Sequence, residues 1–98
     1  MLAKGRAVAD TLQLIRKLDD TVKPSAAVPE AEQWWSIVKQ ITASLESDPH
    51  YSPQEKQALV RVRTVVSEAI LAVRQGQYFS RGTVAGAISA LQQAVERR

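Results

Sequence analysis

Apolar residues recur along the whole chain at spacings of three and four, which is the period of an α-helix with one buried face. The first such stripe consists of Val8, Leu12, Ile15, Leu18 and Val22. It stops before Pro24, because proline has no backbone N–H to donate and its ring clashes with the preceding turn of a helix. No segment of strand length alternates between apolar and polar residues, so the pattern predicts an all-α protein.

Local signals mark where the other helices begin and end. Pro29 suits the first turn of a second helix. Ser52, three residues before Glu55 and directly before a proline, is the pattern of a capping box at the start of a third helix. Gly76 is expected to end that helix, and Ser80 to cap the N-terminus of a fourth.

Together these signals predict a single domain, residues 1–98, built as a small antiparallel bundle of four helices with short connections. The expected helices cover about residues 3–22, 30–47, 53–75 and 81–97. Apolar residues of the third helix fill an arc of roughly 180° around its axis, so this helix is expected to contact two or three neighbours.

The composition narrows the class of protein further. The chain has no cysteine, so it has neither a disulfide framework nor a thiolate metal site, which fits a cytoplasmic protein. No apolar run approaches the roughly 18 residues that a membrane-spanning helix needs, so no membrane partner is expected.

Charge is distributed unevenly along the chain, whose formal net charge is +3. Residues 1–49 carry six basic and seven acidic residues, whereas residues 50–98 carry seven basic and three acidic ones. This asymmetry favours an anionic partner for the second half of the chain. The alternative is that an uneven charge distribution arises by chance in a sequence this short.

Three basic residues of the third helix, Lys56, Arg63 and Arg74, lie within roughly 20° of one another around its axis. We call them the basic edge. They extend over roughly 27 Å of helix, a line that can follow a nucleic-acid backbone. We expect Arg81 to belong to the same nucleic-acid-binding site. The alternative is that these long side chains lay their methylene groups over the adjacent apolar stripe.

Five other residues are predicted to bind a partner protein, namely Trp35, Val60, Leu71, Gly82 and Gly86. Val60 and Leu71 fall among polar positions on one side of the third helix and could form a second contact face. Trp34 and Trp35 are adjacent and cannot both point into one core, so Trp34 is assigned to the core. Trp35 is then an anchor for a partner, unless a wide core accommodates both rings.

Gly82 and Gly86 are four residues apart, and Ala90 follows at the same spacing. Small residues on one line of a helix let a second backbone approach closely. The predicted use is a tight helix–helix crossing, either with the first helix of the same chain or with another protomer.

Residues that carry chemistry are scarce. The only histidine, His50, lies in a predicted loop, and no helical spacing of histidines and carboxylates suggests a metal site. The chain also has no glycine-rich loop of the kind that holds phosphates. The sequence therefore predicts a protein that is not an enzyme and has no cofactor or metal.

The residues Ser80-Arg81-Gly82-Thr83-Val84 read SRGTV and resemble the start of the recognition helix in GntR-type winged-helix repressors. The resemblance covers these five residues and implies a helix-turn-helix DNA-binding regulator. The connection from Gly76 to Ser80 is about two residues longer than the tight turn of that motif, and the preceding helix is also longer than the motif expects.

Three interpretations of function follow. The first is a non-catalytic helical subunit that assembles with a larger partner in a nucleoprotein complex and contacts the nucleic-acid backbone without sequence preference. The second is a protein-only binding module, such as an adaptor, an inhibitor or a homodimer. The third is the helix-turn-helix regulator.

Overall fold

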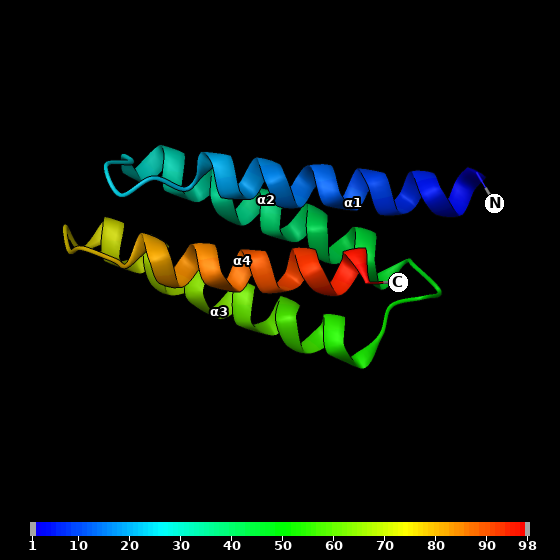
Figure 1. The fold of residues 1–98 in the computed structure, drawn as a ribbon. Coiled ribbons are helices and arrows are strands. Elements are labelled where there is room, and N and C mark those ends of the chain that lie inside the picture. Colours follow the sequence, from blue (N-terminus) through cyan, green and yellow to red (C-terminus); the bar gives the residue numbers. More distant parts are fainter. Residues whose placement is uncertain (1, 98) are drawn as a thin grey trace.

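The computed structural model describes the backbone of residues 2–97 and the side chains of residues 8–97. Within this range the chain forms four helices: α1 (Leu2–Thr21), α2 (Val28–Glu46), α3 (Pro53–Arg74) and α4 (Arg81–Glu96). Successive helices run in opposite directions, so that the connecting loops alternate between the two ends of the molecule (Figure 1). The predicted all-α bundle is confirmed, with every helix boundary within two residues of its predicted position.

The helices contact one another around a ring. α1 packs on α2 and α4, and α3 packs on the same two helices, while the described residues place α1 and α3 diagonally across the bundle. The molecule is elongated along the helices, with extents of 46 × 21 × 17 Å. α3 thus has two helical neighbours, and its remaining side faces outward.

The core draws buried residues from all four helices and is centred on large apolar side chains. The largest is Trp34, which is fully buried and meets the Phe79 ring edge to face, with 5.7 Å between the ring centroids. Burial of such side chains supplies most of the driving force for packing the helices. The buried apolar residues on α3 and α4 are Leu59, Val62, Val66, Ala69, Ile70, Val84, Ala87, Ile88, Leu91 and Val95.

The capping box at the start of α3 is present. The Ser52 hydroxyl accepts a hydrogen bond from the Glu55 backbone N–H at 3.2 Å, and the Ser52 backbone N–H donates to Glu55 Oε1 at 3.0 Å. The Ser52 hydroxyl also donates to the same carboxylate at 2.8 Å. These bonds satisfy backbone groups that the first turn of a helix leaves free, and they hold Glu55 at only 1% exposure.

The end of α3 is set by Gly76, whose φ of 68° lies in the left-handed region. This turn brings the Gln77 N–H to the Ala72 carbonyl at 2.8 Å and the Gly76 N–H to the Val73 carbonyl at 3.2 Å. The pair of bonds is a Schellman motif, which ends the helix where the sequence predicted. No described helix combines the length and the apolar character that crossing a membrane requires.

Candidate interaction surface

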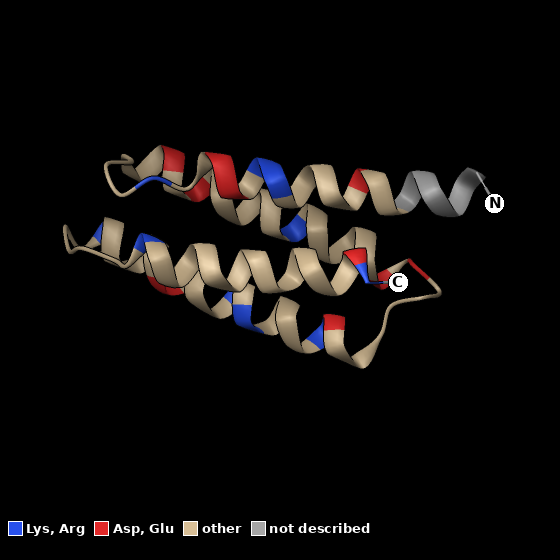
Figure 2. Cartoon of the chain, in the orientation of Figure 1, with Lys and Arg blue, Asp and Glu red and all other residues tan. Residues whose placement is uncertain are grey.

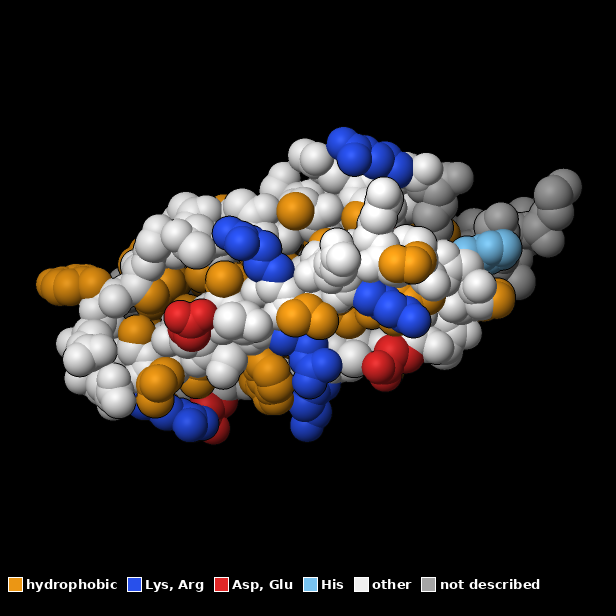
Figure 3. Space-filling view, turned by 90° about the horizontal axis from the view of Figure 1, so that it is seen from below, with side chains coloured by type: hydrophobic (Ala, Val, Ile, Leu, Met, Phe, Trp, Pro, Cys, Tyr) orange, Lys and Arg blue, Asp and Glu red, His pale blue; other side chains and the backbone are white. Residues whose placement is uncertain are grey.

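The side of α3 that faces away from the bundle carries a line of four residues at helical spacing. Val60 and Leu71 are its ends, and they remain 61% and 53% exposed. Thr64 and Ser67 lie between them and are also exposed. We call Val60, Thr64, Ser67 and Leu71 the α3 outer stripe. On the side of the molecule where α3 lies, separate hydrophobic side chains reach the surface between basic ones (Figure 3).

Two shallow hollows adjoin the α3 outer stripe, and Trp35 and Ser67 line both of them. One hollow is lined by Glu32, Trp35, Ser67, Ile70, Leu71 and Arg74. The other is lined by Trp35, Val60, Arg63, Thr64, Ser67 and Glu68. The half-buried Trp35 of α2 therefore lies beside the middle of the stripe, as expected of a boundary residue next to the buried Trp34.

The basic edge runs along the α2 side of the stripe, and each of its members lies against an aromatic ring or a carboxylate. Lys56 lies over the Tyr51 ring, with Nζ 5.5 Å from the centroid, and Arg63 lies over the Trp35 ring. The Arg74 and Glu32 side chains, both 56% exposed, form an ion pair at 3.8 Å. All three cations remain exposed. The structure thus brings the basic edge and the predicted protein-binding residues Trp35, Val60 and Leu71 onto one continuous surface.

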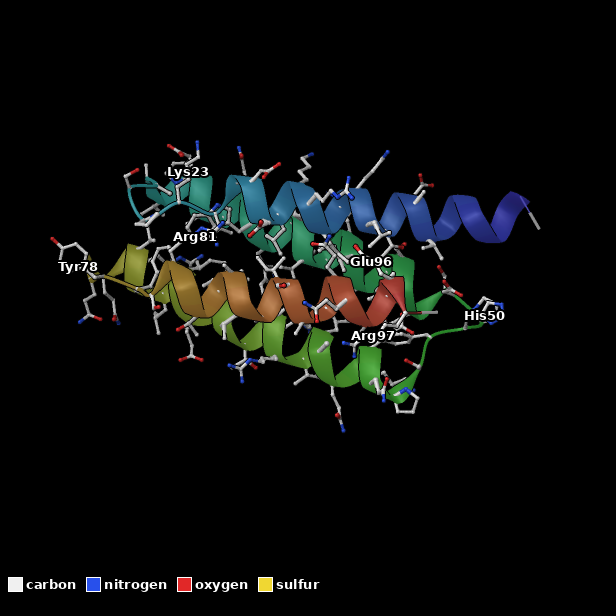
Figure 4. The ribbon with its side chains drawn as sticks, viewed as in Figure 1. Lys23, His50, Tyr78, Arg81, Glu96 and Arg97 are labelled. Carbon is white, nitrogen blue, oxygen red and sulfur yellow. The ribbon has the colours of Figure 1, made fainter. Side chains whose placement is uncertain are left out.

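Arg81 lies elsewhere. Its Nη2 donates to the Asp19 backbone carbonyl at 2.7 Å and to Asp19 Oδ1 at 3.0 Å, near the C-terminal end of α1. Figure 4 shows Arg81 between the ends of α1 and α4. Because α1 is diagonal to α3, Arg81 is not part of the line formed by the basic edge. It ties two helix ends together and compensates the partial negative charge at the α1 C-terminus.

Gly82 and Gly86 lie on the exposed side of α4. A Cβ added at Gly86 would meet no described atom within 4 Å, and one at Gly82 would meet only the Ser80 hydroxyl, at 3.8 Å. The tight crossing with the first helix of the same chain, one of the two predicted uses, is therefore wrong for the part of the chain that the structure describes. Between its ends α4 carries no charged residue, so this face is both small and neutral (Figure 2).

Tyr51, in the loop between α2 and α3, joins the basic edge to the capping box. Its partial burial raises the pKa of its phenol, and the negative charges of Glu46 and Glu55 raise it further, whereas the positive charge of Arg63 lowers it. The pKa of Tyr51 therefore depends on charges of both α2 and α3.

The described residues contain no group of three or more histidine, aspartate or glutamate side chains that could hold a metal ion. His50 is exposed in the α2–α3 loop, where its backbone N–H donates to Asp48 Oδ1 at 2.8 Å. His50 and Tyr78 lie at opposite ends of the bundle (Figure 4).

The SRGTV residues begin α4, and each has an ordinary structural position. Ser80 caps the helix by accepting from the Thr83 N–H at 3.1 Å, and Val84 is buried in the core. α3 and α4 lie side by side and antiparallel, whereas the two helices of a helix-turn-helix cross at about 90–120°. This arrangement gives the resemblance to a recognition helix no support.

Two residues next to the stripe were not singled out from the sequence. Arg61 and Glu68 are seven positions apart and exposed, on the side of the stripe away from the basic edge. Glu68 also lines a hollow with Tyr78, Phe79 and Thr83, which places this flank next to α4. A seven-residue spacing between opposite charges on one helix face is the signal that could have found them.

No protein-family model, no curated protein and no solved structure matches this chain.

Proposed function

We propose that the protein is a non-catalytic assembly module that binds another protein chain through the α3 outer stripe. The observation that carries the proposal is the exposure of Val60 and Leu71 at the two ends of the stripe, with Trp35 and Arg63 directly beside it. Interfaces between proteins are enriched in tryptophan and arginine, and their buried centres are more apolar than the rest of the surface. Action in the reducing cytosol, which the lack of cysteine allows, is part of the proposal.

The middle of the stripe supports the same function. Single exposed apolar residues are ordinary on a protein surface, but here two of them flank small side chains on one line. The Thr64 hydroxyl donates to the Val60 carbonyl at 2.9 Å, so covering it with a partner leaves no unpaired donor. Thr64 and Ser67 also let a partner backbone approach α3 closely.

Photocrosslinking in the cells that encode the protein tests the proposal. A photoreactive phenylalanine at Leu71 or at Val60 is expected to give a discrete covalent adduct with another polypeptide chain. Gln13 is the matched control, because it is exposed on α1, diagonally across the bundle from α3. Absence of an adduct at both stripe positions, or equal adducts at Gln13, would contradict the proposed function.

A second candidate is contact with a nucleic-acid backbone, within a larger nucleoprotein assembly. The observation that favours it is the charge of the exposed α3 surface, where Glu68 is the single acidic side chain among the described residues. The exposed basic ones are Lys56, Arg61, Arg63 and Arg74. Lysine and arginine at successive phosphates release bound counterions, so such binding weakens steeply as salt is added.

Fluorescence anisotropy with labelled single-stranded and duplex oligonucleotides tests this candidate at low and at physiological salt. Changing Lys56, Arg63 and Arg74 together to glutamine is expected to weaken binding and to reduce its salt dependence. Changing Arg16, Lys17 and Lys23 to glutamine removes the same charge from α1 and the loop that follows it, and should have little effect. No binding at low salt removes the candidate.

A further inference from the structure

We infer that the chain seated on the α3 outer stripe is a second copy of this protein, with its α3 antiparallel to the first and a two-fold axis passing between Thr64 and Ser67. The inference rests on the proposed function, since it names the partner of that surface. Isologous two-fold dimers are the commonest soluble oligomers, and they require a surface complementary to itself.

The stripe has that property. In an antiparallel helix pair with two-fold symmetry, the positions of each facing pair add up to the same number. Val60 then faces Leu71 of the second copy, and Thr64 faces Ser67 of the second copy. The small side chains lie at the axis, where the helices come closest, and the exposed apolar side chains meet at both ends.

Charges on the α4 side of the stripe are complementary in nearly the same register. Two-fold symmetry brings residues of the same side together, so Arg61 lies near Glu68 of the second copy, and the pair occurs twice. The positions of this pair add up to 129 rather than 131, an offset of about 3 Å along the helix that the two long side chains can span. Neither side chain forms an ion pair with another described residue of its own chain. A parallel two-fold pair would instead set the α4 side of each copy against the basic edge of the other, so Arg61 and Glu68 of the two copies would not meet.

The α2 side contributes both attraction and repulsion. Trp35 lines the hollows on either side of Ser67, so the two indole rings come near the axis and add aromatic surface. The basic edges of the two copies also lie on this side, and Glu32 compensates only Arg74. Their repulsion opposes association at low ionic strength and is screened once the Debye length falls to about 8 Å, near 0.15 M salt.

Sedimentation equilibrium of the full chain is the first test, at about 0.15 M and about 0.5 M salt, the higher value giving a still shorter Debye length. Over about 5 to 500 µM protein, the weight-average mass is expected to rise from the chain mass of 10.8 kDa toward twice that value. A constant monomer mass over this range would overturn the inference.

Charge reversal then tests the register. Arg61→Glu and Glu68→Arg are each expected to weaken the dimer by about tenfold or more, because each sets like charges against one another twice. An equimolar mixture of the two variants should dimerise as well as the wild type, since both ion pairs reform in the mixed dimer. Arg16→Glu on α1 is the control, and circular dichroism confirms that these exposed substitutions leave the helices intact.

Two further outcomes separate this inference from the proposed function. A dimer that survives both reversals, or a mixture that fails to restore association, would overturn the antiparallel α3 interface. The protein could be a monomer in solution while the Leu71 adduct has the mass of a different protein, such as one that presents an acidic helix to the basic edge. That result would overturn the inference that the partner is a second copy, and it would leave the proposed function standing. The absence of any adduct together with a monomer would remove both.

Discussion

The guanidinium of Arg63 lies over the indole ring of Trp35, with Cζ 6.0 Å from the ring centroid. This contact joins α3 to α2 across the seam where the basic edge meets the hollows. A cation over an aromatic face at an exposed site contributes about 0.5–1 kcal/mol, and it also fixes the position of both side chains. The surfaces assigned separately to nucleic acid and to protein are therefore one surface, and a partner that touches Trp35 also meets Arg63.

The pKa of Tyr51 provides a test of the charges around the α2–α3 loop. In a Tyr78→Phe variant Tyr51 is the only phenol, so ultraviolet absorbance of the phenolate reports it alone. Its midpoint in the folded chain is expected above the ordinary value of 10.0 and should fall toward that value in urea. Arg63→Gln should raise the midpoint further and Glu46→Gln should lower it. A folded midpoint at or below that of the unfolded chain would contradict the geometry.

The raised pKa of Tyr51 also predicts how the stability of the protein changes with pH. Because folding raises the pKa of Tyr51, the folded chain holds the phenol proton more tightly than the unfolded chain does. The contribution of Tyr51 to stability is thus complete below about pH 10 and is lost as the pH rises through the folded pKa. Tyr51→Phe should reduce the alkaline loss of stability measured by urea unfolding, and an unchanged loss would show that Tyr51 is not its source.

Ser52 and Ser80 each cap a helix, but they have different hydrogen-bond partners. Replacing them should therefore lower the free energy of unfolding by different amounts. Ser52→Ala removes both the cap of α3 and a hydroxyl that donates to the buried Glu55 carboxylate. We expect a loss of about 2 kcal/mol of unfolding free energy, the upper end for a cap. Ser80→Ala removes only the bond from Thr83 N–H and should cost about 1 kcal/mol. Urea unfolding that ranks the two in the opposite order would contradict this description of the capping box.

Replacing Arg81 is expected to lower the free energy of unfolding more than replacing Asp19, its ion-pair partner. Arg81→Met removes the hydrogen bonds to both the Asp19 carboxylate and the Asp19 backbone carbonyl, whereas Asp19→Asn leaves the carbonyl in place. With both side chains partly exposed, at 31% and 45%, we expect about 1–2 kcal/mol for Arg81→Met and less than about 1 kcal/mol for Asp19→Asn. Thermal unfolding showing equal losses would mean that the backbone bond contributes nothing.

Gly86 and Gly76 form a matched pair, because an added Cβ would meet nothing within 4 Å at either position. They differ in backbone conformation: Gly86 is helical, and Gly76 has a φ of 68°. Gly86→Ala should therefore raise the unfolding free energy by about 0.5–1 kcal/mol, and Gly76→Ala should lower it by about 1 kcal/mol. If Gly86→Ala destabilises the protein or breaks an assembly, the exposed α4 face has a binding partner of its own.

Much of the fold could be predicted from the sequence because its signals are local. The capping box at Ser52 and the left-handed Gly76 act within a few residues, and so both ends of α3 were predicted. Trp34 is buried and Trp35 is half-buried, as the helical period predicts for two adjacent residues. The period also indicated which side of α3 is buried, and that in turn left Val60 and Leu71 outside.

What the sequence could not show depends on contacts between helices. Thr11 is buried at 2% exposure where the apolar pattern assigned Leu12, because its hydroxyl lies 2.6 Å from the Ser44 hydroxyl of α2. A pattern of apolar residues cannot reveal a polar pair across two helices. Arg81 was likewise grouped with the basic edge by charge alone, and only the packing of α4 on α1 shows that its partner is Asp19.

Disulfide trapping tests most directly whether the α3 outer stripe joins two chains, because the chain has no cysteine of its own. In an equimolar mixture of Thr64→Cys and Ser67→Cys chains under mild oxidation, the mixed disulfide is expected to form fastest. Ser89→Cys, an exposed serine on α4, is expected to crosslink slowly. Crosslinking through residues 64 and 67 that is no faster than through residue 89 would contradict pairing through the α3 outer stripe.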